Sequence, residues 1–141
     1  MGGVSNSSIM ASESGTATFG GIVSLKNNGG FASNRASLNS PDTSGARGIK
    51  LRLKSDAKRY KLRLFNSLNF DNVAYEAPIV GAAGIWVEIE LPFSSFKAVW
   101  RGKPVNNAQP FDQNLISALG FMISDQQVGA FALCLDWIRT Y

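Results

Sequence analysis

The sequence predicts an all-β protein, an antiparallel β-sandwich or jelly roll. Short segments of alternating apolar and polar residues recur along its 141 residues, separated by clusters of Gly, Pro, Ser and Asn. No segment has the apolar spacing of a helix of three turns. A hydrophobic content of 45% and a charged content of 17% are typical of a folded protein. The length suits one domain, predicted over residues 1–141.

The first part of the chain begins with a β-prone segment at residues 16–25, in which a Gly-Gly pair predicts a bulge. A second Gly-Gly pair, within residues 27–35, predicts a bend ahead of Phe31 and Arg35. In an extended chain these two side chains share a face. If Phe31 is a core residue, Arg35 is predicted to form an ion pair, with ligand binding as the alternative. Residues 36–47, rich in polar residues, Gly and Pro, predict a surface loop.

The clearest alternation of apolar and basic residues covers residues 49–54 and 60–65. Its apolar positions, occupied by Leu, Ile and Tyr, predict two half-buried strands. Joined by a turn at residues 55–58, they predict a hairpin with one apolar face and one basic face. Eight Lys and Arg residues lie between Arg47 and Arg63, so the net charge of +4 is concentrated there. The predicted basic face carries Lys50, Arg52, Lys54, Lys61 and Arg63.

The second half of the chain continues the same pattern. Further strands are predicted at residues 73–79, 85–91, 117–124 and 130–140. In the second of these, alternation places Ile85 toward the core and places Trp86 and Glu88 on the opposite side. Two connections are predicted to lack strands: residues 94–100, a short irregular or 3₁₀ segment, and residues 101–114, a polar loop.

The residues available for chemistry argue against an enzyme. The chain has no histidine, the commonest general base and metal ligand near neutral pH. Its single cysteine, Cys134, lies in an apolar segment and is predicted to be a small buried hydrophobe. No catalytic residue, metal ligand or cofactor is predicted. Glu88 and Glu90, about 7 Å apart on one strand face, have a spacing that would suit a glycosidase pair. The alternative is that they form cross-strand ion pairs with the basic hairpin face.

The candidate binding residues are the basic face and the residues predicted to lie near it. Such a cationic and aromatic surface can bind an acidic protein partner, an anionic sugar or RNA. RNA is less favoured, since no compact recognition motif accompanies the charge. The alternative is a solvated outer face that Glu88 and Glu90 partly neutralise. The candidates are Arg35, Lys50, Arg52, Lys61, Arg63, Tyr75, Trp86 and Glu88.

Several motifs follow one another in a fixed order, at residues 1–5, 27–35, 48–53, 60–62, 86, 91–96 and 129–138. Together they resemble the complex I intermediate-associated protein 30 family. The resemblance implies a galactose-binding-like jelly roll, related to carbohydrate-binding modules and without established catalytic residues. It also implies an assembly role, because family members include a mitochondrial assembly chaperone for respiratory complex I. Related domains in cyanobacteria and plastids include some that are joined to a short-chain dehydrogenase-like domain and act in photosystem biogenesis.

The sequence departs from the family pattern at three places. Ser55-Asp56-Ala57 stands where the family often has Gly-Asp-Gly. After the Tyr75-x-Ala77 element, Ile79 stands where the family often has an aromatic residue. The chain also begins inside the first motif, where the family usually has an upstream strand. It is therefore expected to be either a compact variant or a piece of a larger protein, with an open sheet edge near residues 1–8.

These observations favour a non-enzymatic module that binds protein partners during biogenesis of a respiratory or photosynthetic membrane complex. A carbohydrate-binding module is the alternative, and a glycosidase is the third hypothesis. No apolar run is long enough to span a membrane, and no signal-peptide pattern occurs. An intracellular location is expected, in the bacterial cytoplasm or in a mitochondrion or plastid.

Overall fold

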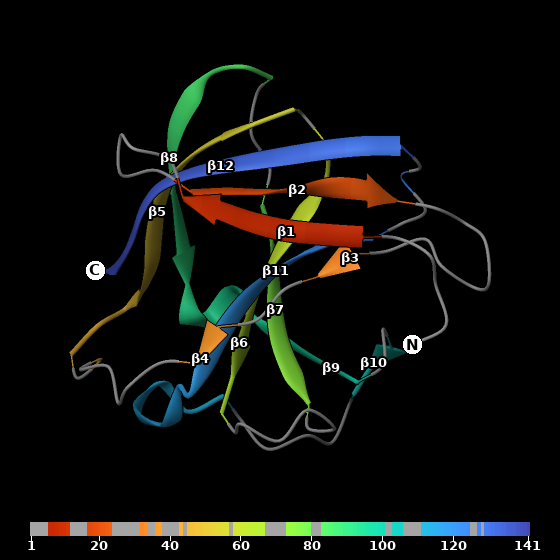
Figure 1. The fold of residues 1–141 in the computed structure, drawn as a ribbon. Helices are drawn as coiled ribbons and strands as arrows, with labels where there is room; N and C mark the ends of the chain where they lie inside the picture. The colour runs from red at the N-terminus through yellow and green to blue at the C-terminus, as the bar shows by residue number, and fades with distance from the viewer. Residues whose placement is uncertain are drawn as a thin grey trace.

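The computed structural model describes residues 6–11, 17–23, 32–33, 36–37, 43, 45–56, 58–66, 73–79, 83–100, 103–105, 111–124, 127 and 129–141. These residues form two antiparallel sheets and two short 3₁₀ helices (Figure 1). The predicted all-β sandwich is confirmed. No helix in these ranges has the length and apolar character needed to cross a membrane.

Sheet A contains five strands in the order β1–β2–β12–β5–β8. Their bounds are β1 Asn6–Ala11, β2 Ala17–Val23, β12 Gly129–Thr140, β5 Gly48–Ser55 and β8 Trp86–Pro92. The open edge predicted near residues 1–8 falls partly on β1, an edge strand of this sheet. The predicted bulge at the first Gly-Gly pair is wrong, because β2 pairs with both neighbours without a register shift there. Ile85 lies just before β8 and is exposed, contrary to its predicted core position.

Sheet B follows the order β10–β9–β7–β6–β11–β3, and β4 also pairs with β11. Its strands are β10 Lys103–Pro104, β9 Lys97–Trp100, β7 Ala74–Ile79, β6 Tyr60–Phe65, β11 Ala118–Ile123, β3 Ala32–Ser33 and β4 Ala36–Ser37. Three segments predicted to lack strands therefore contribute short ones, namely β4, β9 and β10. The predicted 3₁₀ turn is present as η2 (Phe93–Ser95), and a second, η3 (Gln113–Leu115), lies within the predicted polar loop.

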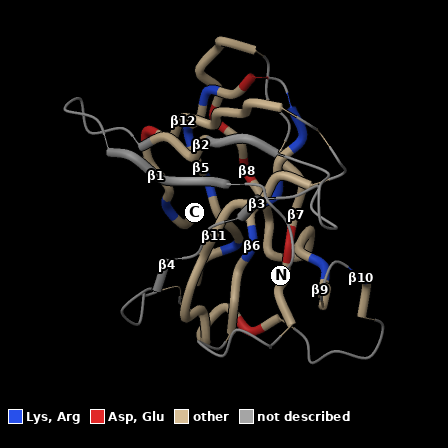
Figure 2. Tube along the Cα trace, turned by 45° about the vertical axis from the view of Figure 1, so that its right-hand side comes forward, with Lys and Arg blue, Asp and Glu red and all other residues tan. Residues whose placement is uncertain are grey.

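The hairpin predicted from residues 49–65 is wrong. β5 pairs with β12 and β8 in sheet A, whereas β6 pairs with β11 and β7 in sheet B. Both strands turn their apolar side to the interior between the sheets, so alternation fits face-to-face packing as well as a hairpin. The basic side chains consequently point away from each other, on opposite outer faces of the sandwich. Figure 2 marks the basic positions along the trace in blue.

Asp56 fixes the crossing of the chain from sheet A to sheet B. Its Oδ1 accepts hydrogen bonds from the Lys58 backbone N–H at 3.1 Å and from the Tyr60 hydroxyl at 2.8 Å. Its Oδ2 accepts from the Ala132 N–H in β12 at 3.0 Å. One carboxylate therefore connects the start of β6 to a strand of the other sheet, which holds the two sheets together at this end.

The core lies between the sheets and is rich in leucine and aromatic rings. Phe19 from β2 and Phe131 from β12 have ring centres 5.0 Å apart, and Tyr60 from β6 contacts both rings. Leu51 and Leu53 face this interior from sheet A. Such buried side chains contribute most of the stability of a sandwich, each adding about 1.5–3 kcal/mol of transfer free energy.

A second, smaller cluster of buried apolar residues lies apart from this core. Alternation along β6 places Phe65 on the side opposite Leu62 and Leu64, and its neighbours across the sheet share that side. The cluster consists of Phe65, Ala74, Val99 and Ala118. The outer face of sheet B is therefore apolar and buried at this end.

Candidate functional site

The structure divides the candidate binding residues between two outer faces. Lys50, Arg52, Trp86 and Glu88 lie on the outer face of sheet A. Lys61 and Arg63 lie on the outer face of sheet B. Tyr75 faces the core and is buried, because β7 alternates Tyr75, Ala77 and Ile79 inward. Arg35 lies outside the described residues.

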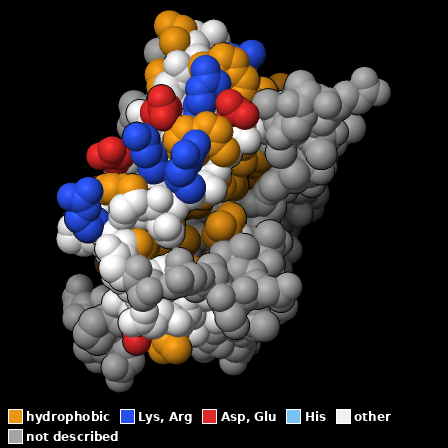
Figure 3. All heavy atoms as spheres, turned by 90° about the vertical axis from the view of Figure 1, so that its left-hand side faces the viewer, with side chains coloured by type: hydrophobic (Ala, Val, Ile, Leu, Met, Phe, Trp, Pro, Cys, Tyr) orange, Lys and Arg blue, Asp and Glu red, His pale blue; other side chains and the backbone are white. Residues whose placement is uncertain are grey.

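The face on sheet A is here called the tryptophan face. Figure 3 shows basic, acidic and hydrophobic side chains interleaved on the side of the molecule where β5, β8 and β12 lie. The face is defined by the charged and tryptophan residues that point outward from these three strands: Lys50, Arg52, Lys54, Trp86, Glu88, Glu90, Asp136, Trp137 and Arg139.

Both tryptophans of this face are half-buried and carry cations over their rings. The Arg52 guanidinium carbon lies 4.9 Å from the centre of the Trp86 ring, and Lys54 Nζ lies 5.2 Å from it. The Arg139 guanidinium lies 3.6 Å from the Trp137 ring. Each such contact contributes about 0.5–1 kcal/mol at exposed sites and holds the cation in place.

A bulge in β12 creates one half of this face. Pairing with β5 shifts register between Leu135 and Trp137, leaving Asp136 as the extra residue. Trp137 then lies opposite Arg52, and Ile138 lies opposite Leu51. Asp136 and Trp137 therefore both face outward, although strict alternation would have turned Trp137 into the core.

Ion pairs neutralise most of the charge on the tryptophan face. Lys50 Nζ lies 3.9 Å from Glu88 Oε1 and 3.7 Å from Glu90 Oε1, and Arg52 Nη1 donates to Asp136 Oδ2 at 3.1 Å. The predicted cross-strand ion pairs of Glu88 and Glu90 are thus present, formed with Lys50. The two glutamates are more than half exposed on an open sheet face, unlike the enclosed carboxyl pair of a glycosidase.

The face on sheet B is smaller and more deeply buried, and we call it the Glu76 cluster (Lys61, Arg63 and Glu76). Lys61 Nζ lies 3.4 Å from Glu76 Oε1, and Arg63 Nε lies 3.8 Å from Glu76 Oε2. The side chains of Arg63 and Glu76 are 17% and 16% exposed. Burial lowers the pKa of Arg63 from its ordinary value, and the charge of Glu76 partly opposes that shift.

Cys134 is not the buried hydrophobe that its flanking residues predict. It points outward from β12, is half-buried, and its Sγ lies 3.5 Å from Thr18 Oγ1. The described residues contain no group of three or more Asp, Glu, Cys or His positioned to hold a metal ion. The two outer faces are therefore suited to binding through rings, cations and hydrogen bonds.

Sequence reasoning missed Asp136, Trp137 and Arg139 as members of the tryptophan face. The available signal was that Trp137 and Arg139 are two residues apart at the end of a strand otherwise built from small and apolar residues. It also missed Lys97, which β9 places opposite Glu76.

Comparisons with known proteins identify a family and a fold. The family model described as complex I intermediate-associated protein 30 matches residues 1–135. Comparison with curated protein sequences gives no significant match.

Solved structures share the fold at low sequence identity. A family 11 carbohydrate-binding module of a cellulosomal cellulase from Clostridium thermocellum is 22% identical, with a TM-score of 0.67 over 96% of this chain and 82% of that one. The same kind of module in complex with a β-1,3-1,4-mixed-linked tetrasaccharide is 20% identical, with a TM-score of 0.67 over 96% and 84%. An agarase is 9% identical, with a TM-score of 0.63 over 97% of this chain and 22% of that enzyme.

Proposed function

The chain belongs to the complex I intermediate-associated protein 30 family, and on this premise we propose that it is a non-catalytic module that binds a protein partner through the tryptophan face. The partner is an intermediate in the biogenesis of a respiratory or photosynthetic membrane complex. The observation that carries the proposal is the pair of half-buried tryptophans, Trp86 and Trp137, each held beneath a guanidinium.

The composition of the face favours a protein partner. Tryptophan and arginine dominate the binding energy of protein interfaces, where rings and guanidinium planes pack with little loss of conformational entropy. Here the cations are already positioned on the rings, so part of the ordering cost is met before association. The tryptophan face carries four basic and three acidic residues, so its net charge does not strongly favour a polyanionic ligand.

Site-specific crosslinking tests this proposal. A photo-crosslinking amino acid at position 88, within the tryptophan face, should capture an assembly intermediate in cells of the source organism. The same amino acid at position 97, on the opposite sheet, is the control and should not capture it. Arg52→Glu should abolish the crosslink at position 88, and Arg63→Glu should leave it unchanged. Equal capture at positions 88 and 97, with both variants folded, would overturn the proposal.

Carbohydrate binding is the second candidate, favoured by the fold shared with family 11 carbohydrate-binding modules. A sugar stacks on an open aromatic face. Because Arg52 and Lys54 lie over Trp86, a sugar stacking on that side would have to displace them. Retention on a mixed-linked β-glucan gel that Trp86→Ala abolishes would support this candidate, and unretarded migration would exclude that glucan as a ligand.

A further inference from the structure

The Glu76 cluster holds an excess of positive charge in a poorly solvated place. Lys61 and Arg63 share Glu76 as their counterion. Lys97, on the neighbouring strand β9, is the register partner of Glu76. Two cations therefore share one carboxylate, and the exposed Lys97 adds a third positive charge at the neighbouring register position. The tryptophan face on the other sheet is nearly balanced by comparison. The buried apolar cluster that includes Phe65 adjoins this site, and the Arg63 guanidinium lies 5.4 Å from the Phe65 ring.

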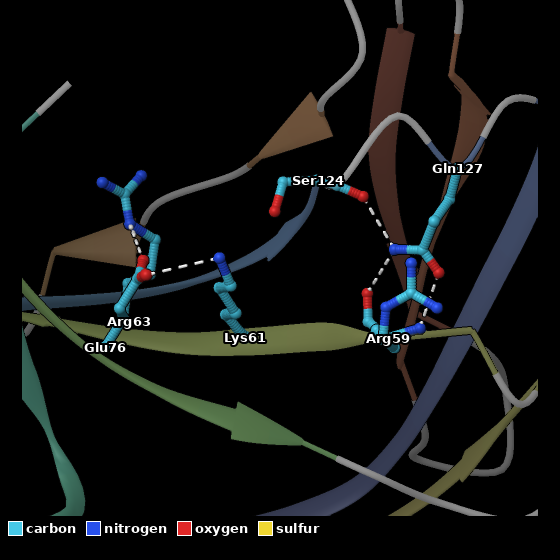
Figure 4. Close-up of polar contacts among 6 residues, drawn as sticks. All are labelled: Arg59, Lys61, Arg63, Glu76, Ser124 and Gln127. Atoms are coloured by element: carbon cyan, nitrogen blue, oxygen red, sulfur yellow. Dashed lines mark hydrogen bonds and ion pairs between the residues drawn. The ribbon is translucent and has the colours of Figure 1, made fainter. Parts of the chain in front are cut away.

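One hydrogen-bond donor of Arg63, its Nε, lacks an acceptor. Its Nε is fully buried and has no hydrogen-bond partner, since 3.8 Å to Glu76 is too long for a hydrogen bond. Figure 4 shows the two terminal nitrogens of the guanidinium on the side of Nε away from the Glu76 carboxylate. Leaving a buried charged donor without an acceptor is more costly than leaving a neutral one. The fork of donors is thus available to a second acceptor.

A second unpartnered group lies just after the adjacent strand, β11. The Ser124 hydroxyl is buried without a hydrogen-bond partner, two residues after Met122, which pairs with Lys61. The side-chain amide of Gln127 donates hydrogen bonds to two backbone carbonyls nearby, those of Ser124 at 2.7 Å and Arg59 at 2.9 Å (Figure 4). Buried polar groups in native proteins are nearly always paired, so the unpaired Nε of Arg63 favours a ligand at this guanidinium. Ser124 lies four residues along the sheet from Gly120, the partner of Arg63, and is too far away to share that ligand.

We propose that Arg63 and Lys61 form an oxyanion-binding site on the outer face of sheet B. The ligand group is a carboxylate, phosphate or sulfate, whose oxygens would accept from the free nitrogens of Arg63 and from Lys61. Glu76 positions both cations and competes with the ligand for them. The site lies on sheet B, whereas the tryptophan face lies on sheet A. Failure of the proposed protein-binding function would therefore leave this proposal unaffected, and the reverse also holds.

Titration followed by NMR tests the site directly. Sodium phosphate and sodium acetate are added separately to the ¹⁵N-labelled protein, with sodium chloride at matched ionic strength as the reference. We expect saturable shifts in residues 60–65, 74–79 and 118–124, with a Kd of about 1–10 mM, which is reasonable for one small anion. Saturation by acetate alone would identify a planar carboxylate ligand, and saturation by phosphate alone a tetrahedral one.

Charge variants separate a built site from general attraction. Arg63→Gln should abolish saturation, whereas Glu76→Gln should tighten binding several-fold because it removes the internal competitor. Glu90→Gln on the tryptophan face removes the same charge elsewhere and should change nothing. If Arg63→Gln does not fold, Arg63→Lys and Lys61→Gln replace it, and each should weaken binding. Shifts that match those in chloride, or binding unaffected by Glu76→Gln and by the Arg63 variants, would overturn the proposal.

Discussion

Arg52 donates a hydrogen bond to Asp136 across 3.1 Å, although the two residues lie 84 positions apart in the chain. The contact exists because β5 and β12 are neighbours in sheet A and because the β12 bulge turns Asp136 outward beside Trp137. The same guanidinium lies over the Trp86 ring from β8. Arg52 therefore joins the three strands of the tryptophan face.

The Arg52–Asp136 pair should orient the face without adding much stability. Both side chains are about one-third exposed, and exposed ion pairs contribute about 0–1 kcal/mol. Asp136→Asn should lower the free energy of unfolding by less than about 1 kcal/mol, measured by urea denaturation. It should also change tryptophan fluorescence, because Asp136 would no longer fix the Arg52 guanidinium over the Trp86 ring. A loss of about 3 kcal/mol or more would mean that the pair behaves as a buried one.

Asp56 should be far more important for stability than Asp136. It accepts three hydrogen bonds, one of them from the buried Tyr60 hydroxyl and one from the Ala132 N–H of the other sheet. Asp56→Ala leaves these donors without their partner and should cost about 2–4 kcal/mol. Asp136→Ala, which removes the same charge from an exposed position, is the matched control. Similar losses in the two variants would refute a special role for Asp56.

Gly48 should tolerate no side chain. A Cβ atom there would lie 2.4 Å from the Leu91 carbonyl oxygen and 2.6 Å from the Pro92 Cα, both backbone atoms of β8. Gly48→Ala should therefore push β8 from β5 and cost about 1–3 kcal/mol, as overpacking does. Gly84, with φ of 71° and open space around it, is the control. Gly84→Asn should cost less than Gly48→Ala, since it meets no steric clash and asparagine tolerates a positive φ better than most residues. A neutral Gly48→Ala would contradict the close approach of the two strands.

For β5 and β6, local alternation was sufficient to predict which face of the strand supplies the core leucines. Leu51 and Leu53 on β5, and Leu62 and Leu64 on β6, are core residues as their spacing predicts. Alternation does not specify which strands pair, because a period of two is satisfied equally by a hairpin and by two sheets facing each other. That ambiguity is the reason the single basic face was predicted and two faces are found.

The errors within the candidate site have a similar local origin. Trp137 was missed because one bulged residue, Asp136, reverses the orientation of all that follows in β12. Tyr75 was expected near the basic residues, but its own strand alternation directs it into the core. The absence of a hydrogen-bond partner for Arg63 Nε depends on exact distances between β6 and β7, which residue spacing does not contain.

Tyr60 should make the protein sensitive to alkaline pH. Burial, together with the hydrogen bond to Asp56 and the charge of Asp56, raises the pKa of Tyr60 far above its ordinary value of 10.0. The unfolded chain ionises this tyrosine above about pH 10, whereas the folded protein keeps it neutral. The stabilisation is therefore complete below pH 10 and is lost as pH rises, by up to about 1.4 kcal/mol per pH unit. Tyr60→Phe should show a shallower decline between pH 10 and 11.5 in urea titrations, and parallel curves for the two proteins would show that Tyr60 ionises as freely in the folded state.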